Sequence, residues 1–254
     1  MFFPYKDDNP RILVPYVTYT ILAVNILVYL YQLSLTDPWL AHLFSLRFGL
    51  IPSHFWGGST VEILDFNRRL IAEASGGLSV VASSRLQLLP APVTMFTSPF
   101  LHGSLMHLLG NMLFLYVFAD NVEGALGHKR FILFYFGAAV IAGLAQLFAS
   151  PSGMLPVIGA SGAISGVLGG YMVKYPKARI HVLVFIVIFI TTIRLPAAVV
   201  LGLWFMVQLL NGLMSYQSEL HGGIAWFEHI GGFAFGFIFM SIVGRSRMFA
   251  RRHG

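Results

Sequence analysis

Apolar residues in this chain are gathered into long segments that contain almost no charged side chains. A helix needs about 20 mainly apolar residues to cross a bilayer whose hydrocarbon core is about 30 Å thick. The pattern predicts membrane helices over residues 13–34, 103–119, 131–149, 161–174, 195–213 and 226–244. We therefore expect an all-α polytopic membrane protein in which residues 1–254 form one domain, with a long non-cytoplasmic loop over 37–100. The N-terminal residues MFFPYKDDNPR carry acids as well as bases, unlike a cleaved signal peptide, so the first helix is expected to be retained.

Basic side chains are concentrated at alternate connections between these segments. They precede the first helix or follow the second, fourth and sixth, and they are Lys6, Arg11, Lys129, Arg130, Lys174, Lys177, Arg179, Arg245, Arg247, Arg251 and Arg252. With six spans, all of these connections fall on one side of the membrane. The positive-inside rule then predicts that both termini are cytoplasmic, and the long loop 37–100 is exempt from this rule.

One apolar stretch does not fit a spanning helix. Residues 180–193 (IHVLVFIVIFITTI) are rich in β-branched side chains, too short to cross the membrane, and followed by Arg194. We expect interfacial or re-entrant structure here, on the cytoplasmic side.

Composition supports a membrane location and removes several classes of function. With 57% hydrophobic and 10% charged residues, the chain has too little charge to cover a water-soluble surface. The absence of cysteine excludes a thiol protease and a disulfide framework. The basic residues follow the predicted membrane topology and form no clustered face with few apolar neighbours, so no nucleic-acid partner is expected. No His-Glu-x-x-His sequence occurs, and His102 and His107 are five apart, so no metal ion or other cofactor is expected.

Polar residues inside the predicted spans mark a candidate site, because such residues are costly in lipid and are usually retained for function. His107 and Asn111 are four apart and therefore share one helix face. Ser161 begins the fourth span, and His229 lies near the start of the sixth. His102 does not share the face of His107, and we expect it to make a structural hydrogen bond.

Helix length predicts the depth of the serine and the histidine. Ser161 precedes Lys174 by 13 residues, so its helix is roughly 20 Å long and begins about 10 Å below the outer membrane surface. His229 precedes Arg245 by 16 residues, or roughly 24 Å along its helix. The two side chains can therefore meet at a similar depth.

Glycines at four-residue intervals favour close packing of these two helices. They are Gly162, Gly166 and Gly170 in the fourth span and Gly232 and Gly236 in the sixth. Small residues at this spacing let helix backbones approach closely in lipid. Close approach is what a short serine side chain needs to reach a histidine on another helix.

These residues predict serine hydrolase chemistry by a dyad. Ser161 would attack a carbonyl carbon, and His229 would accept its proton and later pass it to the leaving group. The side chains of His107 and Asn111 and the backbone N–H of Ser161 would stabilise the oxyanion. Glu228 adjoins His229 but points about 100° away from it on the helix, so no acidic third member is expected. Each residue also has a simpler interpretation, since small residues and polar side chains commonly join transmembrane helices.

The motifs together resemble the rhomboid intramembrane serine proteases. They are FLHGSLMHLLGNM at 100–112, DNVEGALGHKRF at 120–131, GASGA at 159–163, LPA at 195–197 and the His229-x-x-Gly232-x-x-x-Gly236 pattern. The resemblance implies a six-helix bundle, a Ser161–His229 dyad, an oxyanion site of His107, Asn111 and Ser161, and cleavage of single-span membrane proteins, with small side chains before the cut. Where some members carry an aromatic residue stacked on the histidine, this chain has Ser165, so the histidine must be oriented in another way.

Two other functions stay open at this stage. A non-catalytic rhomboid-like protein would bind membrane clients, although such relatives typically lack the serine or the histidine. A small-solute transporter would line a path with His107, Asn111 and His229, but we expect no buried acid, and the chain lacks matching broken helices in related halves. We expect residues 212–227, rich in glycine and polar residues, to act as a movable cap, and we expect a prokaryotic inner membrane as the location.

Overall fold

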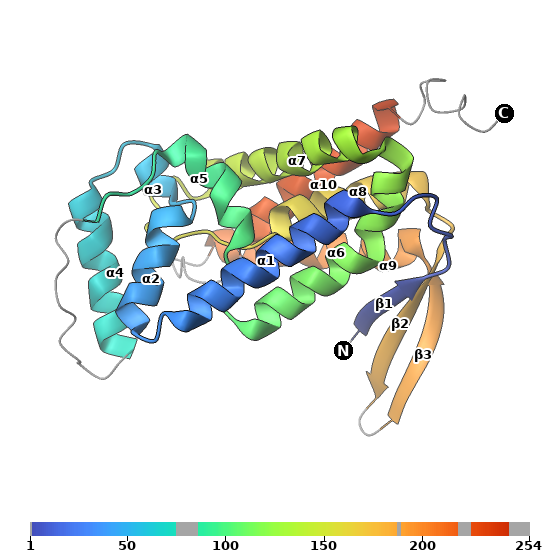
Figure 1. The fold of residues 1–254 in the computed structure, drawn as a ribbon, viewed down its shortest axis with the longest axis horizontal. Helices are drawn as coiled ribbons and strands as arrows, with labels where there is room; N and C mark the ends of the chain where they lie inside the picture. Colours follow the sequence, from blue (N-terminus) through green and yellow to red (C-terminus); the bar gives the residue numbers. More distant parts are fainter. Residues whose placement is uncertain (1, 75–85, 187–188, 218–224, 244–254) are drawn as a thin grey trace.

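The computed structural model describes residues 2–74, 86–186, 189–217 and 225–243. Five of its helices are long and apolar enough to cross a membrane: α1 (Tyr16–Ser34), α6 (Leu105–Leu126), α7 (His128–Ala149), α9 (Ala197–Gln217) and α10 (Trp226–Val243). They form an elongated bundle in which α1, α6, α7 and α10 run side by side (Figure 1). Five of the six predicted spans are thus present as helices of spanning length.

The shorter helix α8 (Ser161–Lys174) lies inside this bundle. Its ten residues 162–171 are all buried, so helices surround it on every side. A helix that is apolar all round is expected to be central. At 14 residues it is about 21 Å long and begins within the bundle rather than at its end.

Helix α6 continues past the predicted end of its span at residue 119. Asp120 and Glu123, which lie beyond that predicted end, are buried inside the helix. Glu123 accepts hydrogen bonds from the N–H groups of Val17 and Thr18 and from the Thr18 hydroxyl, at the first turn of α1. A carboxylate at a helix N-terminus satisfies free N–H groups and complements the helix dipole. The pairing of these acids therefore lets the helix continue to Leu126.

Further polar contacts join the N-terminal segment to the same end of α6. Arg11 donates to Asp120 over 2.7 Å. Asp7 accepts from the amide of Asn121 and from the hydroxyl of Tyr171 in α8. We call the set Asp7, Arg11, Asp120, Asn121, Glu123 and Tyr171 the α6-terminal network.

The expectation of an all-α chain is wrong at residues 179–196. This region forms β2 (Arg179–Ile186) and β3 (Phe189–Pro196), and β1 (Phe2–Asp7) pairs antiparallel with β2 to complete a three-stranded sheet in the order β1-β2-β3. The β-branched side chains that looked like a re-entrant segment favour a strand instead. Alternate residues Ile180, Val182 and Val184 are buried, whereas Thr191 and Thr192 are exposed. The sheet projects from the end of the bundle at which α1 begins (Figure 1).

The predicted loop 37–100 is largely helical in its described parts. It contains α2 (Pro38–Phe48), α3 (Pro52–Phe55), α4 (Thr60–Ala74), α5 (Ala91–Thr97) and the 3-10 helix η1 (Ser98–Phe100). Leu43, Leu46, Ile51 and Ile63 form a small separate core for this layer. The layer covers the opposite end of the bundle from the sheet (Figure 1).

Candidate active site

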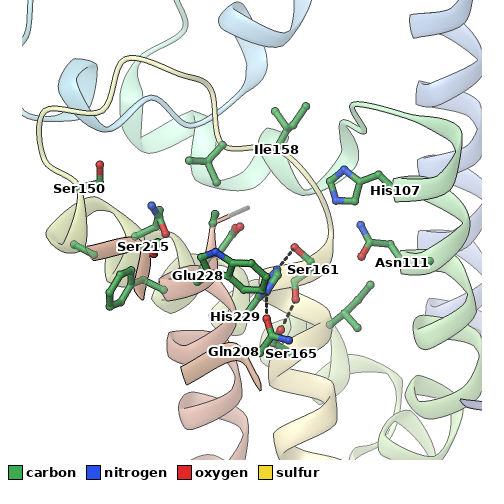
Figure 2. Close-up of a pocket in the computed structure, with 18 of the residues that line it drawn as sticks. His107, Asn111, Ser150, Ile158, Ser161, Ser165, Gln208, Ser215, Glu228 and His229 are labelled. Carbon is green, nitrogen blue, oxygen red and sulfur yellow. Dashed lines mark hydrogen bonds between the residues drawn. The ribbon is translucent and has the colours of Figure 1, made fainter. Parts of the chain in front are cut away.

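Ser161 and His229 are brought together although they are 68 residues apart in the chain. Ser161 is the first residue of α8, and His229 lies in the first turn of α10. The His229 Nε2 and Ser161 Oγ atoms are 2.8 Å apart, a normal hydrogen-bond length (Figure 2). With an unprotonated Nε2, this contact is a hydroxyl donating to an imidazole lone pair.

Backbone contact between α8 and α10 makes this distance possible. A methyl group built at Gly232 would lie 2.1 Å from the Gly162 carbonyl oxygen, and one at Gly236 would lie 1.8 Å from that of Gly166. At Gly166 it would lie 2.4 Å from the Ala138 methyl group of α7. These glycines therefore face one another and leave no room for a side chain.

The segment before Ser161 passes directly beside His107. Gly159 has a φ of +125°, which disfavours other residues, and its N–H donates to the Ser98 carbonyl over 3.0 Å. A methyl group at Gly159 would lie 2.8 Å from His107 Nε2 and 3.5 Å from Asn111 Nδ2. His107 and Asn111 thus approach the nucleophile's own segment from α6, and Figure 2 shows both on the same side of Ser161.

Asn111 and His102 are connected to each other. The Asn111 amide donates to His102 Nε2 over 2.9 Å, so His102 makes the structural hydrogen bond expected of it. Burial lowers the pKa of His102 to about 4, and the positive charge that His107 can carry adds to this effect. A neutral His102 with an accepting Nε2 holds the Asn111 side chain and uses one of its two N–H donors.

Gln208 in α9 contacts the other nitrogen of the His229 ring, and the sequence prediction missed it. His229 Nδ1 and Gln208 Oε1 are 2.8 Å apart, and Gln208 is 6% exposed. Trp204, one turn earlier, places its ring 6.0 Å from the imidazole. The available signal was a glutamine inside an apolar span, where an amide is unusual.

Two side chains close to the dyad in sequence, Ser165 and Glu228, make no hydrogen bond to the dyad side chains in the described structure. The Ser165 hydroxyl donates to the Ser161 carbonyl over 2.6 Å and so makes its bond within α8. The Glu228 side chain packs against Gly162, where a built methyl group would lie 2.6 Å from Glu228 Cγ. Among the described residues, the hydrogen bonds of the His229 ring go to Ser161 and Gln208 and not to Glu228.

A cavity of about 1130 Å³ opens onto these groups. Its wall includes polar residues of the site, namely His107, Asn111, Ser161, Gln208, Glu228 and His229. Apolar side chains such as Trp204, Trp226 and Ile158 complete it. The cavity is large enough for an extended peptide segment and has the mixture of apolar wall and few polar groups that is typical of ligand sites.

The predicted cap 212–227 is only partly within the described residues. Its first part ends α9 and its last part begins α10, and Ser215 and Phe227 line the cavity. Residues 218–224 lie outside the described part of the chain. Within the described ranges no group of three potential ligand side chains is placed to hold a metal ion.

Comparison with known proteins gives matches to one family. The model described as Rhomboid domain matches residues 91–246. Presenilin-associated rhomboid-like protein A, mitochondrial, of Danio rerio is 32% identical over 108 residues, which are 42% of this chain and 27% of that protein. Rhomboid protein 1, mitochondrial, of Saccharomyces cerevisiae is 34% identical over 97 residues, 37% of this chain and 28% of the yeast protein. YdcA of Bacillus subtilis is 37% identical over 78 residues, 31% of this chain and 39% of that protein.

The matched regions thus span between about a quarter and two fifths of each of these relatives. The family match itself covers more than half of this chain and includes α6, α8 and α10, which carry the site. The helices of this chain, together with the family match, show that the protein is an integral, multi-pass membrane protein. The resemblance inferred from the motifs is confirmed: this chain belongs to the rhomboid family.

Proposed function

We propose that this chain is an intramembrane serine endopeptidase that cleaves single-span membrane proteins within or near the bilayer. The observation that carries the proposal is the 2.8 Å contact between Ser161 Oγ and His229 Nε2 at a large cavity between membrane helices. Membership of the rhomboid family supports it.

The reaction follows from the positions of the two side chains. Ser161 Oγ attacks the scissile carbonyl carbon while its proton moves to His229 Nε2. The peptide C–N bond then breaks, and His229 gives the proton to the leaving amine, which leaves an acyl-enzyme. Water, deprotonated by His229, attacks the acyl carbon and releases the acid and Ser161.

Donors for the oxyanion of the tetrahedral intermediate come from two helices. The Ser161 N–H lies at the start of α8, where backbone N–H groups have no helical acceptor and the helix dipole favours negative charge. The His107 ring and the second N–H of the Asn111 amide lie beside the same segment. One such donor is worth about 2.7–4 kcal/mol in other serine proteases.

The substrate follows from the position of the site. A serine between membrane helices is reached by a peptide that already lies in the bilayer, and small side chains before the cut suit the crowded surroundings of Gly159. We propose that the site opens to the non-cytoplasmic side and that both termini are cytoplasmic. A prokaryotic inner membrane stays a prediction, since the relatives include mitochondrial proteins and one of a bacterium.

Incubation of the purified protein in detergent with a labelled single-span substrate tests the proposal. We expect cleavage by the natural chain and none above background by Ser161→Ala or His229→Ala. Ser165→Ala is the matched control, since its hydroxyl lies one turn from Ser161 but bonds within α8, and it should keep most of the activity. Substrate binding without cleavage by the natural chain would instead support a client-binding protein.

A further inference from the structure

The imidazole ring of His229 is held at both nitrogens, and the two contacts have different partners. Nε2 faces the Ser161 hydroxyl in α8, and Nδ1 faces the side-chain oxygen of Gln208 in α9 (Figure 2). A neutral imidazole carries its proton on one nitrogen only. The partner at Nδ1 therefore decides whether Nε2 is free to act as a base.

We propose that Gln208 is the positioning residue of the dyad, a neutral counterpart of the carboxylate found in serine protease triads. This inference rests on the proposed function. An amide oxygen only accepts, so its contact over 2.8 Å puts the proton of His229 on Nδ1. Nε2 then presents a lone pair to Ser161, and Gln208 also fixes the rotation of the ring. The reverse tautomer would give an Nε2–H that cannot take the serine proton.

Among the helices around His229, α9 is the one that orients its imidazole ring through Nδ1. Ser165, the side chain of α8 one turn from Ser161, is bonded to the Ser161 carbonyl. Glu228 packs against Gly162. Trp204 lies 6.0 Å from the imidazole centroid and shares a face of α9 with Gln208, four residues later. Within the described part of the chain, α9 thus supplies both a hydrogen bond and a ring contact to the histidine.

A neutral amide suits this depth better than an acid. Placing a carboxylate at the centre of a membrane helix costs about 2.5–3.5 kcal/mol on insertion scales. An amide orients the ring without that cost, but it stabilises the imidazolium of the transition state less than a carboxylate would.

The location of Gln208 also links the dyad to the position of α9. The opposite side of this helix is open to the surroundings of the bundle, with Leu203 62% and Met214 61% exposed. A displacement of α9 would draw Gln208 Oε1 away from His229 and release the ring. Alignment of the base therefore depends on how this helix is seated.

Replacement of Gln208 by residues of similar length separates the effects of the acceptor from those of packing. In Gln208→Met, which keeps the shape but removes the acceptor, we expect kcat to fall by about a hundredfold with KM changed less than about threefold, because wrong-tautomer effects in serine proteases reach about 10⁴. Gln208→Glu should retain activity, and its acid limb should move to higher pH by about one unit because a nearby negative charge favours imidazolium. Asn211→Leu is the matched control. It removes an amide from the same helix, and its kcat should stay within about threefold of that of the natural chain.

A second measurement reads the tautomer without any substrate. With ¹⁵N-labelled histidine, NMR of the detergent-solubilised chain should give a protonated Nδ1 and an unprotonated Nε2 for His229, and Gln208→Met should shift this population toward Nε2–H. Activity of Gln208→Met equal to the natural chain, or a His229 tautomer unaffected by it, would overturn the proposal. If the natural chain cleaves nothing but the tautomer responds to Gln208→Met, the positioning contact stands and the proposed function fails.

Discussion

The α6-terminal network and the candidate active site use polar side chains within one bundle in opposite ways. In the network, Glu123 accepts from two backbone N–H groups and a hydroxyl, and Arg11 pairs with Asp120, so charges are matched by several partners. In the site, the hydrogen bonds of the dyad join neutral groups in a short series, Ser161 to His229 to Gln208, beside an open cavity. The network is suited to hold helices together, whereas the site keeps donors and acceptors available to a substrate.

Loss of the Glu123 carboxylate should have the largest effect of the changes considered, and the effect should be on stability. Glu123→Leu leaves the first N–H groups of α1 unpaired at a position that is 0% exposed. We expect the free energy of unfolding to fall by about 3–5 kcal/mol, as for removal of one partner of a buried charged contact. Denaturant unfolding in detergent measures it.

The same variant should keep the chemistry of the folded fraction. We expect the kcat of folded Glu123→Leu to stay within about threefold of the natural chain, because the network and Ser161 lie at different ends of α8. Glu62→Leu replaces an exposed acid and should change the stability by less than about 0.5 kcal/mol. If kcat of the folded variant fell well beyond threefold, the α6-terminal network would not act on stability alone.

Removal of an oxyanion donor should lower kcat strongly and stability only slightly, the reverse of the Glu123→Leu effect. In His107→Ala we expect kcat to fall by about 10²–10³, or about 2.7–4 kcal/mol in activation free energy. In the described part of the chain, the His107 ring packs against Gly159 and His102 and makes no side-chain hydrogen bond. The free energy of unfolding should therefore fall by only about 1 kcal/mol. Parallel kinetics and unfolding measure both, and an unchanged kcat would remove His107 from the oxyanion site.

A smaller, pH-dependent effect is expected at Asp7. Burial raises the pKa of this carboxyl, and the nearby charge of Asp120 adds to the rise. The folded chain then binds a proton at Asp7 more readily than the unfolded chain, so this contribution to stability grows as pH falls through the folded pKa and is lost as pH rises.

Asp7→Asn should remove this pH dependence. Relative to the natural chain, the variant should be more stable at pH 7 than at pH 4, by less than about 1 kcal/mol because Asp7 is partly exposed. Unfolding of both chains at the two pH values measures the difference. A stability difference that moves in the other direction would show that the carboxylate is the favoured form in the network.

Much of this architecture could be predicted because lipid imposes a simple rule on sequence. Length and apolar character were enough to locate the spanning helices, and the short distance from Ser161 to Lys174 indicated a helix that begins inside the bundle. The end of α6 was predicted too early because a charged residue normally ends a span. Asp120 accepts there from its neighbour Asn121 and is paired with Arg11, which lies 109 residues earlier in the chain.

The remaining errors and omissions also depend on distant partners. The segment of strand β2 looked interfacial because, of the two strands that pair with it, β3 follows it directly but β1 lies at the start of the chain. Gln208 was missed because its role depends on which helix face meets His229, and the sequence of α9 does not distinguish Gln208 from Asn211, another amide in the same apolar span. Local patterns therefore predict elements and reactive residues, but the side chains that orient them come from tertiary packing.

The dyad is tested most directly by a fluorophosphonate, which reacts with an activated serine by forming an O–P bond and releasing fluoride. Detergent-solubilised protein would be incubated with this probe, digested and analysed by mass spectrometry, beside His229→Ala and Ser165→Ala. We expect an adduct on Ser161 in the natural chain and in Ser165→Ala, and almost none in His229→Ala. Equal labelling of Ser161 in His229→Ala, or no labelling of Ser161 in the natural chain, would contradict it.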